Sequence, residues 1–402
     1  MAAVAPEHPV ALVLAGGGAR GAYEVGALSV LLPELEARGE RPSIILGTSA
    51  GALNAAYLAA NAQLAVADLL PTALQIWESI SWGMVVRPLI SGASLRRVGA
   101  YLGEAVGVPG VRLVSLLDPA PLRRTVAQRV DFDQLARNVA AGAVSAAGVV
   151  TTSARTGRSV VFHAGGGSPP RDRRRAIDYV TASIAEDHVL ASAAIPVIFP
   201  AVEVQRPAPA RGWYIDGGTR MNTPIKPALA FGAGRVVVIA LNSLAPGPAR
   251  PAGSARPDAL LGAGQVLLGL LEDQLVSDLQ TLAGVNDLVT ASGATELAGK
   301  RQVPYIVIAP RTRTTIGEIA LRVIRECCSG PVNAVRSPDL AFLARLLAAD
   351  TDPQHAELLS FLLFEAQFGE ALIELGRRDA RRWLAASHDL DDLWQLGPLN
   401  PD

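Results

Sequence analysis

Lysine and cysteine are scarce in this sequence of 402 residues. Its only lysines are Lys226 and Lys300, and neither lies in a glycine-rich loop. The phosphate-binding loop of P-loop nucleotide hydrolases, G-x-x-x-x-G-K-[ST], contains a lysine. The sequence therefore excludes a P-loop nucleotide hydrolase. The only cysteines, Cys327 and Cys328, are adjacent, so they cannot join distant parts of the fold and form no C-x-x-C pair. We therefore expect a chain without disulfides that folds in a reducing compartment.

Neither sign of charge is in excess. Lysine and arginine number 36 together, against 37 aspartates and glutamates, which gives a formal net charge of -1. Without an overall positive field, the chain is not expected to bind nucleic acid. Histidines, cysteines and carboxylates form no group with metal-ligand spacing, so we expect no metal and no organic cofactor. None of the histidines stands in a recognisable catalytic motif; they are His8, His163, His188, His355 and His388.

The N-terminal residues do not have the pattern of a secretory signal. No lysine or arginine precedes the first apolar run, and that run leads into a glycine-rich loop where a signal would have its cleavage site. The uncharged span 42–67 could be mistaken for a membrane helix, but polar side chains and glycines interrupt it, as in a strand, turn and helix. We expect a cytoplasmic protein that contacts membranes peripherally.

What the sequence does have is apolar periodicity, with 50% hydrophobic residues. The apolar run 9–15 predicts a strand, and after a glycine-rich loop the spacing of apolar residues predicts a helix. A second strand over 43–46 breaks at Gly47 and is followed by a helix of small residues. Two such units in succession predict a parallel sheet that is covered on both faces.

The α/β alternation continues through the middle of the chain. Residues 80–110 are irregular, and 143–162 predict two strands joined by a turn at 156–157. A helix is predicted over 179–192, and 213–241 predict a strand, a tight turn, a helix and another strand. Between the strands of 143–162 and the helix over 179–192 lies a basic loop that we expect to be solvated or to meet anionic lipid headgroups; its arginines are Arg171, Arg173, Arg174 and Arg175.

A proline-rich segment divides the chain into two parts. Residues 8–245 are expected to form the catalytic core, and 246–257 the linker. Residues 258–402 are expected to be mostly helical, with one added strand over 303–309. A strand after the linker favours a C-terminal region that packs on the core.

A G-x-S-x-G motif is the first chemical signal. It occupies the turn between the second strand and its helix, as Gly47-Thr48-Ser49-Ala50-Gly51. In that context the serine hydroxyl is exposed on a sharp turn, and the helix N-terminus faces developing negative charge. Serine is also a preferred N-cap residue, so the motif alone allows a nucleophile or a helix cap.

A glycine-rich loop follows the first strand, with the sequence Gly16-Gly17-Gly18-Ala19-Arg20-Gly21. Its backbone N–H groups could stabilise the oxyanion of an acyl transfer. The same letters fit a dinucleotide-binding loop, which requires an acidic residue at the end of the second strand. Ser49 and its neighbours stand there, with no carboxylate.

Asp216 is the candidate base. It follows a strand and precedes Gly217 and Gly218, which would let the backbone turn sharply. Asp-Gly is also a common hairpin turn. A partly desolvated carboxylate can accept the serine proton directly, while His163 and His188 remain alternatives for the base.

Taken in order, these three motifs resemble the patatin-like phospholipase family, and the likeness covers about residues 10–245. The resemblance implies a three-layer α/β/α fold with a mostly parallel central sheet, and hydrolysis of lipid acyl esters by a Ser-Asp dyad. By position, Ser49 would be the nucleophile and Asp216 the base. The oxyanion hole and its support would comprise Gly16, Gly17, Gly18, Arg20, Gly21 and Ala50.

We therefore expect a serine lipid acyl hydrolase, of the phospholipase A or carboxylic ester hydrolase type, that acts through an acyl-enzyme. Its partner would be a lipid or phospholipid ester. The alternatives are a dinucleotide-binding protein and a catalytically silent lipid-binding or scaffold protein of the same fold.

Overall fold

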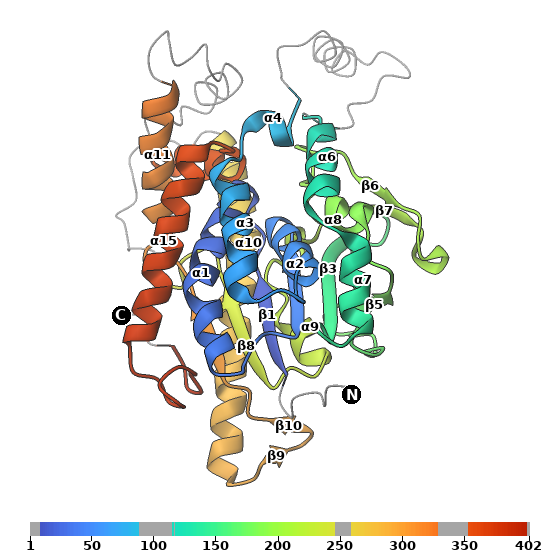
Figure 1. Cartoon of the computed structure of the whole chain (residues 1–402), viewed down its shortest axis with the longest axis vertical. Helices are drawn as coiled ribbons and strands as arrows, with labels where there is room; N and C mark the ends of the chain where they lie inside the picture. Colours follow the sequence, from blue (N-terminus) through green and yellow to red (C-terminus); the bar gives the residue numbers. More distant parts are fainter. Residues whose placement is uncertain (1–8, 88–114, 116, 246–258, 329–352, 400–402) are drawn as a thin grey trace.

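The computed structural model describes residues 9–87, 115, 117–245, 259–328 and 353–399. Its centre is a mixed sheet of nine strands in the described part of the chain (Figure 1). The order is β11-β8-β1-β2-β3-β4-β5, and β7 pairs with β3 and with β6. The strands are β1 (Val10–Leu14), β2 (Ile44–Thr48), β3 (Ala146–Ser153), β4 (Ser159–Gly165), β5 (Ile177–Thr181), β6 (Val202–Val204), β7 (Gly212–Asp216), β8 (Arg235–Ile239) and β11 (Tyr305–Ile308).

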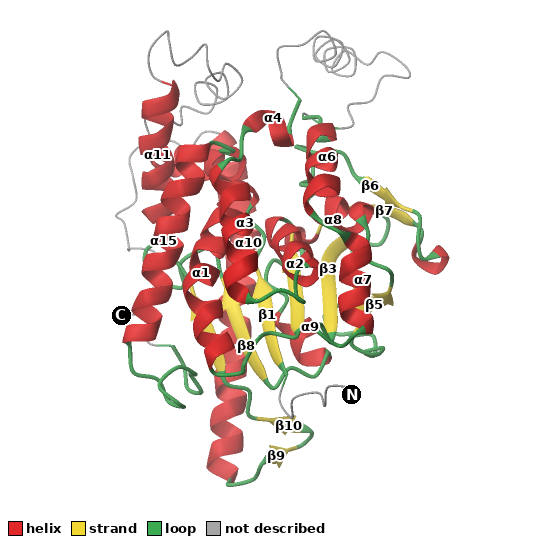
Figure 2. Ribbon diagram, viewed as in Figure 1, coloured by secondary structure: helices red, strands yellow, loops and turns green. Residues whose placement is uncertain are grey.

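Helices cover both faces of this sheet (Figure 2). On one side the described helices are α1 (Gly21–Ala37), α2 (Ala50–Ala60), α3 (Val66–Glu78), α6 (Ala120–Arg129), α7 (Phe132–Ala140), α8 (Glu186–Ser192) and α15 (Ala366–Ala385), and on the other α9 (Ile225–Ala230) and α10 (Ala259–Ser292). Three further described helices contribute buried side chains to the hydrophobic cluster of the first side, namely α4 (Trp82–Val85), α11 (Thr315–Cys328) and α14 (Pro353–Leu359). The remaining elements are the hairpin of β9 (Glu296–Leu297) and β10 (Lys300–Arg301) and the 3-10 turns η1 (Gly18–Arg20), η2 (Ala208–Ala210), η3 (Gly217–Thr219) and η4 (Ser360–Leu362).

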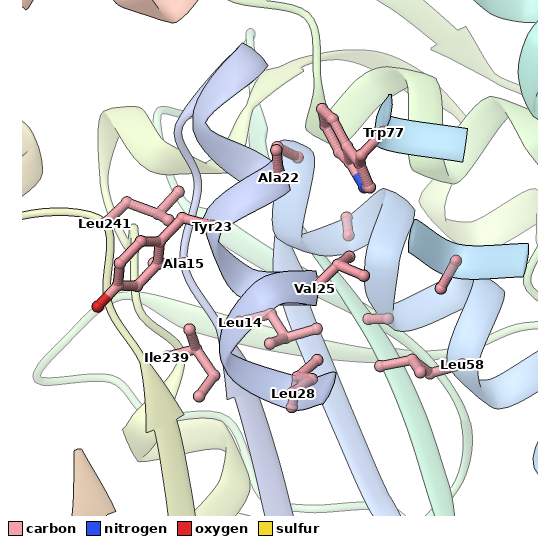
Figure 3. Close-up of a cluster of buried hydrophobic side chains, with 14 of the residues drawn as sticks. Leu14, Ala15, Ala22, Tyr23, Val25, Leu28, Leu58, Trp77, Ile239 and Leu241 are labelled. Atoms are coloured by element: carbon pink, nitrogen blue, oxygen red, sulfur yellow. The ribbon is translucent and has the colours of Figure 1, made fainter. Parts of the chain in front are cut away.

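Alternation along β1 explains the layers. Leu12 and Leu14 belong to the hydrophobic cluster under α1, α2 and α3, whereas Ala11 and Val13 belong to the cluster under α9 and α10. Figure 3 shows the first cluster, where Tyr23 and Leu28 of α1 pack over the strands. A strand that is apolar on both faces fits the interior of a sheet with helices on either side. The predicted three-layer α/β/α fold is confirmed.

The strand pairing agrees with the predicted β-α units. β1 pairs in parallel with β2 and β8, and β2 in parallel with β3. The turn predicted at 156–157 joins β3 and β4. The helix predicted over 179–192 is wrong in its first half, because β5 occupies Ile177–Thr181 and α8 begins only at Glu186. The β-branched and aromatic residues of β5 pair with β4, which offers a free edge to them.

The described parts of the C-terminal region pack on the sheet and on α1. β11 adds a parallel strand beside β8. Tyr23 in α1 donates a 2.9 Å hydrogen bond from its hydroxyl to Asp379 in α15. The C-terminal region, predicted to be mostly helical from residue 258 on, begins with α10, which ends at Ser292 and is followed by the β9–β10 hairpin. The linker predicted over 246–257 and much of the irregular segment 80–110 lie outside the described residues.

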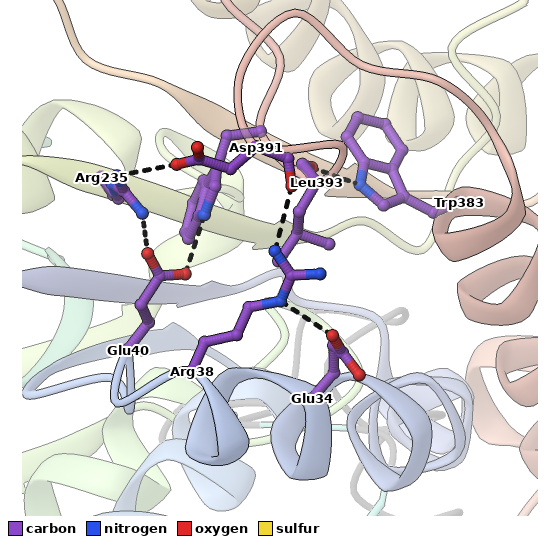
Figure 4. A network of polar contacts seen from close by, with 8 residues as sticks. Glu34, Arg38, Glu40, Arg235, Trp383, Asp391 and Leu393 are labelled. Atoms are coloured by element: carbon purple, nitrogen blue, oxygen red, sulfur yellow. Dashed lines mark hydrogen bonds and ion pairs between the residues drawn. The ribbon is translucent and has the colours of Figure 1, made fainter.

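A polar network ties the C-terminal residues to the sheet (Figure 4). Arg235 at the start of β8 forms ion pairs with Glu40 and, at 3.6 Å, with Asp391. Arg38 donates to the Asp391 carbonyl at 3.0 Å, and the indole of Trp394 donates to Glu40 at 2.9 Å. Residues that are far apart in the sequence thus form one polar network at the C-terminal end of α1.

Candidate active site

Two strands end facing each other beside β3. β2 runs parallel to β3 and its last residue, Thr48, pairs with Val150. β7 runs antiparallel to β3 on the same side, and its last residue, Asp216, pairs with Thr151. Adjacent strand residues are about 3.3 Å apart along a strand. The register therefore brings Asp216 next to Ser49, which directly follows β2.

Ser49 occupies a strained turn. Its φ is 54° and its ψ is -121°, a conformation that costs of order 1–3 kcal/mol for a residue with a side chain. Ser49 stands at the N-cap of α2, but its side chain makes no capping hydrogen bond, and its hydroxyl instead hydrogen-bonds the Asp216 carboxylate. The turn is tight, since a Cβ on Gly47 would lie 2.1 Å from the Gly51 carbonyl oxygen. The side chain of Ser49 is thus not a helix cap.

A serine that sequence analysis missed holds this turn. The N–H of Ser49 donates to Ser192 Oγ at 2.8 Å, and Ser192 Oγ donates to the Val150 carbonyl at 2.6 Å. Ser192 is the last residue of α8 and is fully buried. It connects the strained turn to β3.

Burial changes the acidity of Asp216. Its side chain is 5% exposed and accepts hydrogen bonds from the Ser49 hydroxyl and, at 2.6 Å, from the Gly218 N–H. Burial raises the pKa of this carboxyl to about 7, although the hydrogen bonds from Ser49 and Gly218 each lower it. A carboxylate with a pKa near neutrality can accept and return a proton.

The glycine loop is fastened to the segment after Asp216. The N–H of Gly16 donates to Asn222 Oδ1 at 3.1 Å, and Asn222 Nδ2 donates to the Gly16 carbonyl at 3.2 Å. Thr48 in turn donates from its hydroxyl to the Met221 carbonyl at 3.1 Å. The three motifs of the sequence therefore meet at one point.

Free backbone donors remain at this point. Within the described part of the chain, no acceptor bonds the N–H groups of Gly17, Gly18 or Ala50, whereas Asn222 occupies the N–H of Gly16. Gly18 has a φ of +59° and its α-carbon approaches the Phe361 carbonyl so closely that a Cβ would lie 2.1 Å away. The close approach and the positive φ together require glycine there.

Arg20 points away from Ser49 and Asp216 and into the C-terminal region. Its nitrogens donate to Ser360 Oγ (2.8 Å), Asn242 Oδ1 (3.0 Å) and the Glu357 carbonyl (2.7 Å). The guanidinium also pairs with the Glu357 carboxylate at 2.6 Å and lies 3.8 Å above the Phe361 ring. The side chain is fully buried. Arg20 thus anchors the glycine loop, while Gly21 begins α1 beside Trp77.

Two cavities open at Ser49. The first, which we call the Asp216 cavity, lies between the glycine loop, Asp216 and the C-terminal side chains Leu358, Phe361 and Leu362. The second, the apolar cavity, starts at Ser49 and Gly18 and runs between α2, α3 and α6. Its helical lining residues include Ala50, Leu53, Asn54, Tyr57, Ala73, Ile76, Trp77, Leu122, Thr125, Val126 and Arg129.

The histidines proposed as alternative bases are engaged elsewhere. His163 Nδ1 lies 2.8 Å from the Gly165 carbonyl, and His188 contacts the Arg206 carbonyl at 3.0 Å. Neither lines the Asp216 cavity or the apolar cavity. Burial lowers the pKa of both imidazoles. Among the described residues there is no group of histidines, cysteines and carboxylates that could hold a metal ion.

Ion pairs hold part of the basic loop. In the predicted basic loop, Arg171 pairs with Asp178 at 3.3 Å and Arg175 with Asp278 at 2.6 Å. None of the helices in the described ranges is both long and apolar enough to cross a membrane.

Comparison with known proteins agrees with these motifs. The model of the family described as patatin-like phospholipase matches residues 12–229, which contain all three motifs. No curated protein matches the chain. A solved structure that it resembles is VipD from Legionella pneumophila, with 14% identity, a TM-score of 0.30, and coverage of 89% of this chain and 67% of that one. Membership of a phospholipase family supports lipid acyl hydrolysis as the general activity and replaces the dinucleotide-binding alternative. The match spans more than half of the sequence, so this chain belongs to the patatin-like phospholipase family.

Proposed function

We propose that this chain cleaves fatty acyl esters in two steps, with Ser49 as the nucleophile and Asp216 as the only base. The observation that carries the proposal is the hydrogen bond from the Ser49 hydroxyl to a buried carboxylate whose pKa is about 7. That carboxylate is ionised in about half of the molecules at neutral pH, and it is basic enough to take the serine proton as the hydroxyl attacks.

In the first step, Ser49 Oγ bonds to the ester carbonyl carbon while its proton passes to Asp216. The negative charge on the carbonyl oxygen is stabilised by the unoccupied N–H groups of Gly17, Gly18 and Ala50. The carbonyl then re-forms, the bond to the alcohol breaks, and the alcohol leaves with the proton from Asp216. A fatty acyl group remains esterified to Ser49.

In the second step, water attacks this acyl-enzyme. Asp216 takes a proton from the water, the same N–H groups stabilise the oxyanion, and collapse releases the fatty acid. The proton returns from Asp216 to Ser49 Oγ, so the site is restored. No redox change and no further reactant is needed.

The two cavities support an ester with one long apolar arm. The apolar cavity begins at the nucleophile and suits an acyl chain, whereas the Asp216 cavity, bounded by the C-terminal side chains, suits the alcohol. Removing apolar surface from water contributes about 0.8 kcal/mol for each buried methylene, which favours lipid esters over acetate esters.

Labelling with a fluorophosphonate tests the nucleophile, and hydrolysis of soluble 4-nitrophenyl esters tests turnover. We expect Ser49→Ala to abolish labelling, and both Ser49→Ala and Asp216→Asn to abolish turnover while circular dichroism stays unchanged. The controls are Ser145→Ala and Asp392→Asn, which change exposed residues and should behave as the unmodified protein.

Three outcomes would contradict the proposal. Substantial turnover by Asp216→Asn would assign the base to another group, with His163 and His188 the first to replace. Labelling that survives Ser49→Ala would move the nucleophile. A folded protein that is neither labelled nor active would be a lipid-binding or scaffold member of the family.

A further inference from the structure

The apolar cavity has an ordered wall. Its residues on α2 are spaced as one helical face, with Ala50, Leu53 and Tyr57 at i, i+3 and i+7. On α6, Leu122 and Arg129 stand in the same i, i+7 relation. A cavity that follows one face of each helix over two turns is a channel that runs along the helix axes.

The nucleophile lies at one end of this channel. Ser49 directly precedes α2, and Trp77 of α3 packs near the first turn of α2, where its ring would meet a Cβ on Gly21 together with Ala50. Tyr57 marks the opposite end. The seven residue-to-residue steps from Ala50 to Tyr57 span about 10 Å of helix, close to the length of an extended acyl chain of about eight carbons.

Two side chains with polar groups, Asn54 and Tyr57, lie on the α2 face of the channel, and the Tyr57 hydroxyl donates to the Leu69 carbonyl at 3.2 Å. Asn54 Nδ2 donates to Glu24 at 2.7 Å and to the Gly21 carbonyl at 3.1 Å, and Asn54 Oδ1 accepts from the Trp77 indole at 2.9 Å. It therefore presents no unpaired polar atom to an apolar chain.

The far end of the channel adjoins a groove on the surface. A groove on the outside of α2, α3 and α6 shares four residues with the apolar cavity, namely Tyr57, Ile76, Arg129 and Val130. We call it the outer groove. Past these residues its lining combines the apolar side chains of Leu64, Ala127 and Phe132 with polar or acidic ones, namely Asn61, Asp68, Thr72, Gln128, Asp131 and Asp133. In Figure 1, α2 is drawn between α3 and α6, as this arrangement requires.

We propose that this channel is open at both ends and takes long acyl chains, whose first eight or so carbons fill the apolar cavity while the remainder passes Tyr57 and Arg129 into the outer groove. The inference rests on the proposed function and adds a substrate class to it. A closed pocket of the same depth would reject longer chains, because extra methylenes forced against a packed wall cost about 1–3 kcal/mol. An open channel has no such limit.

The experiment is a series of 4-nitrophenyl esters from butyrate to myristate, measured in one detergent mixture. We expect kcat/KM to rise about fourfold for each methylene up to octanoate, because each is buried in the channel. Beyond octanoate we expect a plateau that extends to myristate. A fall of about tenfold or more between octanoate and laurate would show a closed end and overturn the proposal.

Arg129→Trp narrows the exit. Arg129 is exposed on α6, so the folded core is not disturbed, and the larger ring meets the channel end. We expect this variant to lower the ratio of myristate to octanoate kcat/KM about tenfold. Arg124→Trp is the matched control, since it makes the same charge change at another exposed position on α6 that lines neither cavity. An equal ratio in both variants would contradict an exit at Arg129.

A binding measurement separates this inference from the proposed function. In Ser49→Ala protein, calorimetric titration should show that laurate binds as tightly as octanoate, and adding Arg129→Trp should weaken laurate binding about tenfold relative to octanoate. If no ester is hydrolysed but the two fatty acids bind in this way, the proposed function fails and the channel stands. If laurate binds about tenfold or more weakly than octanoate in the Ser49→Ala protein, the channel has a closed end and the inference fails, whether or not esters are hydrolysed.

Discussion

Asp216→Asn should make the folded protein more stable at high pH, even though it removes the proposed base. In the unmodified protein the pKa of Asp216 is about 7, against 3.8 for an ordinary aspartate, because burial penalises the ionised form. The folded state therefore holds a proton that the unfolded chain has already released between these two values. Stability that is present at low pH is lost as the pH rises through the folded pKa. Because asparagine does not titrate, the Asp216→Asn protein does not lose this stability as the pH rises.

The size of the effect follows from the two pKa values. Between about pH 5 and about pH 8, the unmodified protein should lose about 3 kcal/mol of unfolding free energy through this carboxyl. The difference between the Asp216→Asn and unmodified proteins should grow by the same amount. Hydrogen bonds lost in the variant lower its unfolding free energy equally at both pH values. The titration of all other groups changes the unfolding free energy of both proteins equally. Both contributions therefore cancel when the growth of the difference with pH is measured.

Urea unfolding at both pH values measures this difference, provided that the transitions are two-state with equal slopes. Asp392→Asn, at an exposed carboxyl, is the control and should show no growth with pH. Ser49→Ala removes a hydrogen bond that lowers the pKa of Asp216. The unfolding free energy of the Ser49→Ala protein should therefore continue to fall up to a higher pH than that of the unmodified protein. A difference between Asp216→Asn and unmodified protein that stays constant from pH 5 to pH 8 would refute the reasoning about burial.

The proposed base, Asp216, must be ionised to accept a proton, so kcat/KM for a soluble ester should rise with pH to half its maximum near pH 7, and a flat profile would contradict this role. Ser192→Ala leaves the Ser49 N–H and a strand carbonyl unbonded; we expect the unfolding free energy to fall by about 1–3 kcal/mol and kcat to fall further than in Ser145→Ala. Arg20→Met leaves Glu357 without its ion-pair partner and should cost about 3–5 kcal/mol in urea unfolding, against about 0–1 kcal/mol for Arg137→Met at an exposed pair; equal costs would contradict a buried anchor.

Local signals in the sequence were sufficient for the early strands and helices. The apolar run before Gly16 and the break at Gly47 predicted strand, loop and helix because glycine and apolar periodicity act over a few neighbouring residues. The same reasoning failed at 179–181. The edge of β4 offers backbone partners to that segment, and nothing within the segment announces a neighbour from elsewhere in the chain.

The contacts that complete the candidate site could not be predicted from the sequence for the same reason. Arg20 bonds a residue 337 positions away, and no pattern near either residue links the two. Ser192 lies in an ordinary helix end, and its bond to Ser49 exists only because α8 packs against β3. The mutual bonds of Asn222 and Gly16 likewise depend on the order of strands in the sheet.

One strand, β3, holds both members of the proposed Ser-Asp pair in register. Thr48 and Asp216 pair with its neighbouring residues Val150 and Thr151, so a single peptide unit of an internal strand sets how far apart Ser49 and the Asp216 carboxylate stand. Segments that line the Asp216 cavity, among them the C-terminal turn at Phe361, do not set this distance. Relatives could therefore exchange those segments and acquire new lipid preferences while the proposed reacting pair keeps its spacing.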